Sequence, residues 1–408
     1  MTERLYYDDP GLLEFDAVVT DLRATDDAQA TLVALDRTAF YPTSGGQPFD
    51  TGALTVAGVQ HVVGDVQDDD GGIIWHRLAS ATNIAVGSAV HGSIDIERRV
   101  DHRQQHSGQH LLSAVLLDLF GYPTVSFHLG GDSSTIDLAA PALTEQQLRT
   151  AADRCNQIIF EDRAIAIHYC TVEEARARGV RKIAPGIERV RVIEITGLEF
   201  NACGGTHVNS TGQIGVLLCR STEKVKQGMR LEFICGKRAA RAAAADYDEL
   251  RRAGALLSSG VAQVAGAVNR VVGDSKRQSK TIQKLESELA AALAPQFASQ
   301  AEDGILVRYF AERNASFAKL LAQNIVRDSA QQMIVLFAVD TPTPTLICAR
   351  GEHESDRRLD SAALLRETLA LFAGHGGGSP TLAQAGIADA AQLQPALAFA
   401  HRLARGER

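Results

Sequence analysis

Two short segments, far apart in the chain, each place two metal-binding side chains four residues apart. The segment HSGQHLL (106–112) contains His106 and His110, and CGGTH (203–207) contains Cys203 and His207. Residues i and i+4 of a helix share one face, so His106 and His110 can supply two corners of a tetrahedral zinc site. The glycines between Cys203 and His207 let the backbone fold tightly and bring thiolate and imidazole to one point. A chain that binds zinc through all four must bring the two segments together, which strongly constrains its fold.

His102 has the same spacing from His106 as His110 does. It precedes the apolar helical periodicity, so we predict that it is solvated or stands behind the ligands.

Four protein ligands describe a closed, structural zinc, whereas a catalytic zinc keeps one position open. The sequence leaves three options: the metal becomes five-coordinate, one ligand yields to substrate, or the site is structural.

The order of hydrophobic patterns predicts an α+β protein in four parts. Short alternating runs broken by Gly and Asp turns predict a small β-barrel or strongly bent sheet in residues 1–90. Residues 91–240 read as an α+β zinc-containing domain with helices on one face of an antiparallel sheet. Residues 241–295 read as a helical linker of one or two long helices, and 296–408 as an α/β domain.

Local signals place several boundaries within this plan. We expect a helix from His106 that Gly121 and Pro123 stop, and a capping box at Thr144 and Gln147. An apolar stripe in the linker follows helical spacing; its members are Ile282, Leu285, Leu289 and Leu293.

Composition narrows the class of protein. Among 408 residues, 45% are hydrophobic and 22% are charged, as in ordinary globular proteins. The N-terminus lacks the pattern of a signal peptide, and the six cysteines form no disulfide framework, so we expect a reducing cytoplasm. A net charge of −8 argues against a generic nucleic-acid binder. Seven basic residues between Arg220 and Arg241 still allow a local basic face, with a solvated surface as the alternative.

HSGQHLL and CGGTHV together resemble the two zinc motifs of the alanyl-tRNA synthetase editing domain and of its free-standing relatives, the AlaX-type trans-editing proteins. TAFYPTSGGQPFDTG (38–52) and the C-terminal GHGGGSPTLAQAG (374–386) also resemble this family, in the same order. The resemblance covers nearly the whole chain. Because no class II ATP-binding region precedes these motifs in the sequence, we expect an editing factor of the long AlaX form without ligase activity.

The resemblance also assigns roles to residues. It implies zinc ligation by His106, His110, Cys203 and His207, and recognition of a serine hydroxyl by Thr38. It implies that Gly45, Gly46 and Gln47 line the same pocket, and SFHLG (126–130) places His128 near it. The implied reaction is zinc-dependent hydrolysis of Ser-tRNA(Ala), and of Gly-tRNA(Ala) as a further substrate.

The C-terminal glycine motif resembles one shared with DHH phosphoesterases. Its motif residues are Gly376, Gly377, Gly378, Gln384 and Gly386. Backbone N–H groups of such a segment can cradle a phosphate, but no P-loop lysine accompanies them. The linker helices and this domain are expected to bind the outer part of tRNA or to form a homodimer. Basic residues of the linker that can meet phosphates are Arg251, Arg252, Arg270, Lys276, Arg277, Lys280 and Lys284.

Two other functions compete with editing. A phosphoesterase of that type needs a DHH triplet, and the nearest match in the sequence is DHR at 101–103. The alternative that stays open is a tRNA-binding protein with a structural zinc and no catalytic activity.

Overall fold

The computed structural model describes residues 1–25, 30–78, 84–226, 228–329, 333–340, 343–351 and 360–407. The chain forms two compact units, Met1–Arg252 and Ala253–Arg408. The boundary falls inside the stretch expected to be a helical linker. Each unit has its own hydrophobic cores.

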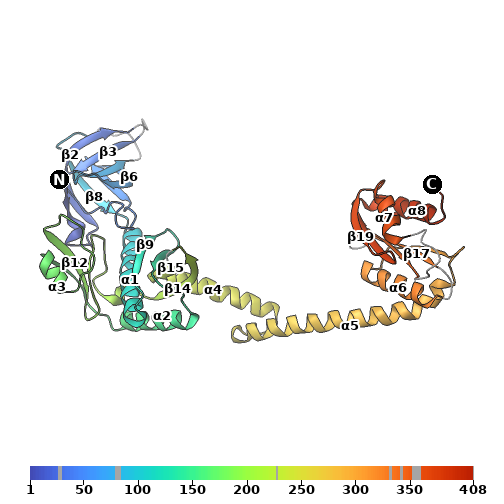
Figure 1. Cartoon of the computed structure of the whole chain (residues 1–408). Helices are drawn as coiled ribbons and strands as arrows, with labels where there is room; N and C mark the ends of the chain where they lie inside the picture. The colour runs from blue at the N-terminus through green and yellow to red at the C-terminus, as the bar shows by residue number, and fades with distance from the viewer. Residues whose placement is uncertain are drawn as a thin grey trace. The chain divides into compact units, whose positions relative to one another are not determined.

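The first unit begins with a closed six-stranded barrel, in the order β2-β3-β7-β6-β5-β8 (Figure 1). Alternate residues of β2, including Phe15, Ala17 and Val19, are buried, as the period of a strand with one face on a core requires. The predicted small barrel is therefore confirmed. The barrel strands are β2 (Glu14–Ala24), β3 (Thr31–Leu35), β5 (Gly52–Val56), β6 (Val59–Asp68), β7 (Ile74–Leu78) and β8 (Ala89–Ile94). Beside it lie β1 (Glu3–Arg4), the 3-10 turn η1 (Leu5–Tyr7) and β4 (Arg37–Thr38).

The helix that carries HSGQHLL is α1 (Ile96–Phe120). It ends at Gly121 in the left-handed conformation, as predicted, but it begins ten residues earlier than the periodicity indicated. Asp95 caps it by accepting hydrogen bonds from the N–H groups of Glu97 and Arg98. His102 is therefore inside the helix and only 3% exposed, so the prediction that it is solvated was wrong.

Two antiparallel sheets complete the first unit. One has the order β14-β15-β10-β9 and the other β11-β12-β13. The predicted capping box at Thr144 and Gln147 is present at the start of α2. The strands are β9 (Thr124–Leu129), β10 (Ser134–Leu138), β11 (Ile165–Thr171), β12 (Arg189–Ile195), β13 (Glu199–Ala202), β14 (Leu217–Val225) and β15 (Gly228–Cys235). The helices are α2 (Glu145–Phe160), α3 (Val172–Ala177), the 3-10 turn η2 (Thr211–Ile214) and α4 (Gly236–Leu256).

A buried arginine fastens the barrel to α1. Arg99 and its partner Asp50 are both fully buried, and Nη2 of Arg99 lies 2.6 Å from Oδ2 of Asp50. The same guanidinium donates to the carbonyl oxygens of Pro10 and Ala39. A buried charge is tolerated only when it is paired and hydrogen-bonded in this way, so the contact holds the barrel in a defined place on the helix.

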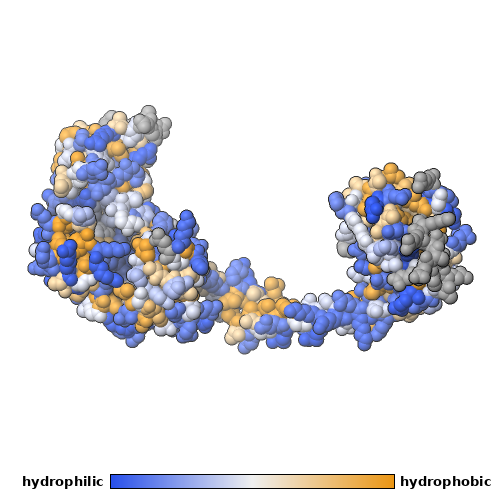
Figure 2. Space-filling view, viewed as in Figure 1, coloured by the Kyte–Doolittle hydropathy of each residue, from blue (hydrophilic) through white to orange (hydrophobic). Residues whose placement is uncertain are grey.

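The second unit begins with the long helix α5 (Val264–Ala298), which follows η3 (Val261–Gln263). Pro295 lies inside the last turn of α5. The linker was predicted to end at residue 295, and the helix continues for three residues beyond it, to Ala298. Val268, Val271, Val272, Ile282, Leu285 and Leu289 are exposed on α5, and apolar surface is visible along this part of the chain (Figure 2). Among the described residues, no single helix combines the length and apolar character needed to cross a membrane, although the bent pair α4 and η3–α5 meets that test together.

A five-stranded sheet, in the order β16-β17-β18-β20-β19, forms the core of the second unit. Only β16 and β17 pair in parallel among these strands, and the other neighbours are antiparallel. The strands are β16 (Ile305–Phe310), β17 (Ile334–Val339), β18 (Thr345–Arg350), β19 (Gly374–Gly378) and β20 (Leu382–Ile387). The helices are α6 (Ala315–Asp328), α7 (Ser361–Leu369), the 3-10 turn η4 (Ala390–Gln392) and α8 (Leu393–Ala404).

Candidate metal centre

The four predicted ligands meet in the first unit. One donor atom from each of His106, His110, Cys203 and His207 lies within 4.8 Å of the others. The sulfur of Cys203 is 3.5 Å from Nε2 of His106 and 3.3 Å from Nε2 of His207. The three imidazoles are buried, and Cys203 is half-buried. Three imidazole nitrogens and one thiolate are a donor set that suits Zn²⁺, so the residues present fit this metal.

The second nitrogen of each imidazole has its own partner. Nδ1 of His106 is 2.9 Å from Oε1 of Gln47, and Nδ1 of His207 is 3.3 Å from the hydroxyl of Ser107. Nδ1 of His110 faces two groups from β13, the carboxylate of Glu199 at 3.6 Å and the amide of Asn201 at 3.4 Å. Such partners fix the orientation of a histidine ring and leave the opposite nitrogen free for a metal.

Two arginines hold the loop that contains Cys203 and His207. Nη1 of Arg191 donates to the carbonyl oxygens of Cys203, at 2.5 Å, and Gly205, at 3.1 Å. Nε of Arg103 donates to the carbonyl of His207 at 2.7 Å. The loop also needs a glycine at 205, because an added Cβ would lie 2.1 Å from Cε1 of His106. The glycine is thus required by packing against a ligand as well as by the tightness of the turn.

The charges of the cluster favour a thiolate. Burial alone would raise the pKa of Cys203, but the facing rings of His106 and His207 lower the pKa of this thiol well below its ordinary value. Burial alone would lower the pKa of His110, but hydrogen bonds with Cys203 and Glu199 raise it to about 10, so metal binding would have to displace a proton from this ring. Burial keeps the pKa of His207 well below its ordinary value, so this ring stays neutral, as a ligand must.

The barrel loop expected to line the pocket reaches the cluster through Gln47. Its side chain is fully buried, accepts from the N–H of Thr206 and donates to the hydroxyl of Thr206. Gly45 and Gly46 precede it with φ of 58° and 87°, values that favour glycine. A Cβ at Gly46 would also lie 2.9 Å from the carbonyl oxygen of Phe127. These residues therefore position Gln47 against His106.

Thr38 is held inside the barrel domain, where its hydroxyl is already engaged. Nδ1 of His76 lies 3.0 Å from the carbonyl oxygen of Val33, which can only accept, so Nδ1 carries the proton. Nε2 of His76 therefore accepts from the hydroxyl of Thr38 at 2.8 Å, and that hydroxyl accepts from the N–H of Phe40. Burial lowers the pKa of His76 to about 4, which agrees with a neutral ring. No exposed surface of Thr38 remains for a substrate in this structure.

No contact between the side chain of His128 and the four ligands is found among the described residues. His128 is exposed on β9, and its neighbour Phe127 stacks on the ring of His106 with centroids 5.4 Å apart. Successive residues of a strand point to opposite faces, so only one of the two can reach the metal centre. The sequence signal for Phe127 was present in SFHLG, but the face was misassigned.

The residues of the C-terminal glycine motif belong to the second unit. Gly376, Gly377 and Gly378 form part of the edge strand β19, and Gln384 and Gly386 lie on its partner β20. The motif is thus an extended hairpin at the edge of the sheet. Alternate residues of such a strand direct their N–H groups away from the partner strand, and the phosphate cradle stays a prediction.

A cavity of about 310 Å³ opens beside the metal centre, and we call it the metal-side cavity. Its wall includes Phe127, Glu199 and Asn201, which all contact ligand histidines. Polar groups from α1 and β9 also line it: Gln109 donates to the hydroxyl of Ser113, as does Thr124. Arg181 and Lys182 complete the lining with positive charge.

Three family profiles match this chain in sequence order. They are tRNA synthetases class II (A) over residues 3–98, the threonyl and alanyl tRNA synthetase second additional domain over 190–231, and the DHHA1 domain over 302–406. The second profile spans Cys203 and His207, and relatives along nearly the whole chain are alanine–tRNA ligases. The chain belongs to the alanyl-tRNA synthetase editing-domain family.

Individual members of the editing-domain family show how far the likeness extends. The alanine–tRNA ligase of Pyrococcus furiosus is 33% identical over 309 residues, which is 74% of this chain and 33% of that protein. The Pyrococcus abyssi enzyme is 29% identical over 97% of this chain and 43% of its own length. The Methanosarcina barkeri enzyme is 28% identical over 97% of this chain and 44% of its own length. The chain thus spans less than half the length of these relatives.

Proposed function

We propose that this protein hydrolyses the ester that joins a wrong amino acid to the 3′ end of tRNA(Ala), with Ser-tRNA(Ala) as the main substrate. The observation that carries the proposal is the convergence of His106, His110, Cys203 and His207 next to a cavity whose walls combine apolar and polar side chains. Membership of the editing-domain family supports the same chemistry.

The metal-side cavity meets the centre at Phe127, Glu199 and Asn201, which contact the rings of His106 and His110. An ester held in this cavity would approach the centre from this side. A bound zinc would polarise the ester carbonyl or lower the pKa of a water molecule toward about 7. Glu199 and Gln47 keep two imidazoles oriented, and Phe127 stacks on the ring of His106.

Discrimination between serine and alanine requires a partner for one hydroxyl group. A site built to hydrogen-bond that hydroxyl rejects the analogue that lacks it, because its own polar groups then stay unpaired. The linked polar groups of Gln109, Ser113 and Thr124 line the metal-side cavity and are suited to this task. They are better placed for it than Thr38, whose hydroxyl is bonded to His76.

The test is to incubate the full chain with Ser-tRNA(Ala) and with Ala-tRNA(Ala), with and without a chelator, and to measure ester loss. The proposal expects zinc-dependent loss of serine and little loss of alanine. Tight binding of both tRNAs without hydrolysis would instead establish the alternative function, a tRNA-binding protein whose zinc is structural. That alternative is favoured by the four protein ligands, which can close a tetrahedral site.

A further inference from the structure

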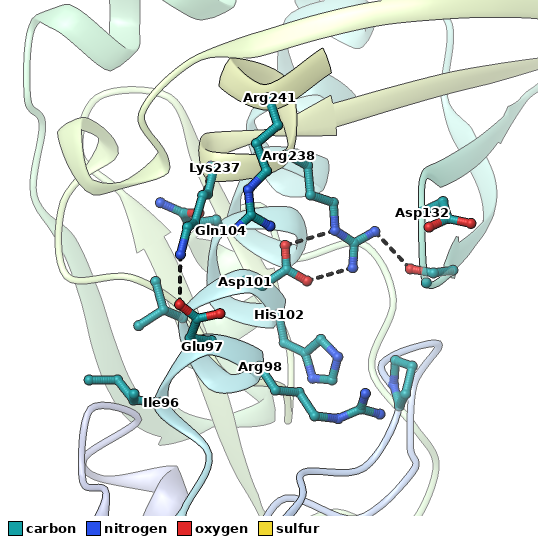
Figure 3. A pocket seen from close by; sticks show the side chains of 14 residues that line it. Ile96, Glu97, Arg98, Asp101, His102, Gln104, Asp132, Lys237, Arg238 and Arg241 are labelled. Atoms are coloured by element: carbon teal, nitrogen blue, oxygen red, sulfur yellow. Dashed lines mark hydrogen bonds and ion pairs between the residues drawn. The ribbon is translucent and has the colours of Figure 1, made fainter. Parts of the chain in front are cut away.

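A second and larger pocket lies beside the first turns of α1, away from the metal ligands (Figure 3). We call it the α1 pocket, and its volume is about 780 Å³. Its walls come from α1, the start of α4, the β9–β10 turn and Pro48 of the barrel loop. A volume of this size accommodates a nucleotide-sized ligand.

In two ion pairs of the α1 pocket, a basic and an acidic side chain neutralise each other's charge. Arg238 makes a bidentate contact with Asp101, and the amine of Lys237 is 2.7 Å from the carboxylate of Glu97. Both pairs are drawn in Figure 3. These groups shape the wall and hold the start of α4 against α1, so they contribute little net charge to a ligand.

The remaining charges are less fully compensated. Arg241 is exposed at the pocket; it lies close enough to Glu97 for their charges to interact, but it makes no hydrogen bond with another described residue. Arg98 lies over the ring of Phe49, at 5.2 Å, and its Nε donates to the carbonyl of Phe49, whereas its terminal nitrogens make no hydrogen bond with a described residue. Asp132 likewise has no partner among the described side chains. The pocket thus offers two cationic groups and one acceptor to a ligand.

Apolar side chains supply a surface at the same place. Ile96 and Val100 are exposed and Pro48 is half-buried, and all three line the pocket, so they give it an apolar wall on which a base can rest. His102 also lines the pocket but is only 3% exposed. Its Nδ1 is 3.9 Å from Oδ1 of Asp50, and neither atom has a hydrogen-bond partner among the described residues.

Two elements connect the α1 pocket with the metal centre. Along α1, Arg98 and His102 precede His106, and Gln109 and Ser113 of the metal-side cavity follow it. Eight residues of helix separate Arg98 from His106, which is about 12 Å along the axis. β9 runs the opposite way, with Phe127 at the centre and the turn that holds Asp132 after it. The metal centre therefore lies between the two cavities.

We propose that the α1 pocket binds a nucleotide of the RNA tail that precedes the aminoacylated one. Its phosphate contacts Arg241 and Arg98, and its base lies against Pro48, Ile96 and Val100. The carboxylate of Asp132 accepts from a base amino group or a ribose hydroxyl. This inference rests on the proposed function, because it assigns one part of the same substrate to a second site.

The deciding variant is Arg241→Ala, assayed on two substrates. One is Ser-tRNA(Ala), and the other is the 3′-seryl ester of adenosine, which has no phosphodiester and cannot reach the α1 pocket. We expect kcat/KM for Ser-tRNA(Ala) to fall about 10-fold through KM, and hydrolysis of seryl-adenosine to stay unchanged. The slope of log affinity against log salt for tRNA should become shallower by about 0.7, as for one lost contact to single-stranded RNA.

The matched control is Arg176→Ala, which removes the same charge from an exposed position on α3, outside the α1 pocket and the metal-side cavity. Arg241→Lys should retain most of the affinity. Equal weakening by Arg176→Ala, or an equal loss on both substrates in Arg241→Ala, would overturn the inference.

A separate readout distinguishes failure of the pocket from failure of the proposed function. If the wild-type chain hydrolyses neither substrate, binding of the trinucleotide CCA is compared between the wild type and both variants by calorimetry. Weaker binding in Arg241→Ala alone supports the pocket, and unchanged binding overturns it. Binding of a free mononucleotide that depends on Arg241 without any change for the trinucleotide also overturns it.

Discussion

The metal centre and the glycine hairpin of β19 and β20 are built in opposite ways. The centre gathers side chains from α1, the barrel loop and the segment after β13, so its order comes from many long-range contacts. The hairpin uses backbone from residues close in sequence, at the open edge of a sheet. A change in the first region should therefore act through distant partners, and a change in the second should stay local.

The largest effect is expected from Cys203→Ala, which removes the only thiolate of the cluster. We expect loss of bound zinc and a decrease in ester hydrolysis of more than about 100-fold. Removing a residue that only hydrogen-bonds to a ligand typically costs about 10- to 100-fold, and removing the ligand itself should cost more. Metal content and hydrolysis of Ser-tRNA(Ala) are the measurements. The control is Cys219→Ala, because burial raises the pKa of Cys219 to about 12 and this thiol is outside the cluster. Full hydrolysis by a zinc-free Cys203→Ala protein would separate the metal from the activity.

Glu199→Gln should have the next largest effect, because it removes the carboxylate facing Nδ1 of His110 while keeping the shape of the side chain. We expect zinc affinity or activity to fall about 10- to 100-fold. Chelator competition measures the zinc affinity. Glu194→Gln is the matched control, since Glu194 forms a similar pair with His168 that involves no ligand. Equal losses in both variants would point to general destabilisation.

Thr38→Val should mainly affect stability. It leaves Nε2 of His76 and the N–H of Phe40 without partners in a fully buried place, at a cost of about 2 kcal/mol. Hydrogen exchange at Phe40 and its neighbours reports this change in the barrel alone, and Thr38→Ser should restore the protection. If Thr38→Val instead keeps full protection and loses hydrolysis of Ser-tRNA(Ala), the role that the family resemblance gives Thr38 is correct.

The smallest effect on hydrolysis is expected from the glycine hairpin. A Cβ at Gly376 would lie 2.3 Å from the carbonyl oxygen of Gln384, whereas one at Gly377 meets nothing within 4 Å. Gly376→Ala should destabilise the second unit by about 1–3 kcal/mol, and Gly377→Ala should hardly change it. Hydrogen exchange in β20 measures the difference. Neither variant should alter the hydrolysis of seryl-adenosine, and a loss there would contradict the independence of the two regions.

The sequence predicted those features that depend on local signals or on the chemistry of single residues. The capping box at Thr144, the stop at Gly121 and the ligand types at 106, 110, 203 and 207 were of this kind. The β-barrel followed from alternation in its strands.

Other features depended on contacts that no local pattern encodes. The start of α1 was missed because its first three turns are mostly polar and lack a continuous apolar stripe, and because buried members such as Arg99 are held by long-range contacts such as that with Asp50. His128 was chosen over Phe127 because a single strand does not reveal which face meets a distant helix. The roles of Arg191 and Glu199 were missed because both act across segments, on carbonyl oxygens or on a ring nitrogen.

The buried Arg99 has a consequence for how substrates are chosen. Its guanidinium bonds to carbonyl groups of Pro10 and Ala39 and to Asp50, and lysine has neither the planar fork nor the number of donors to replace it. Barrel and helix are therefore fastened before any RNA arrives. A receptor assembled in advance selects by fit on arrival, so under the proposed function a wrong amino acid would be distinguished by what enters the cavity rather than by a later closing of the protein around it.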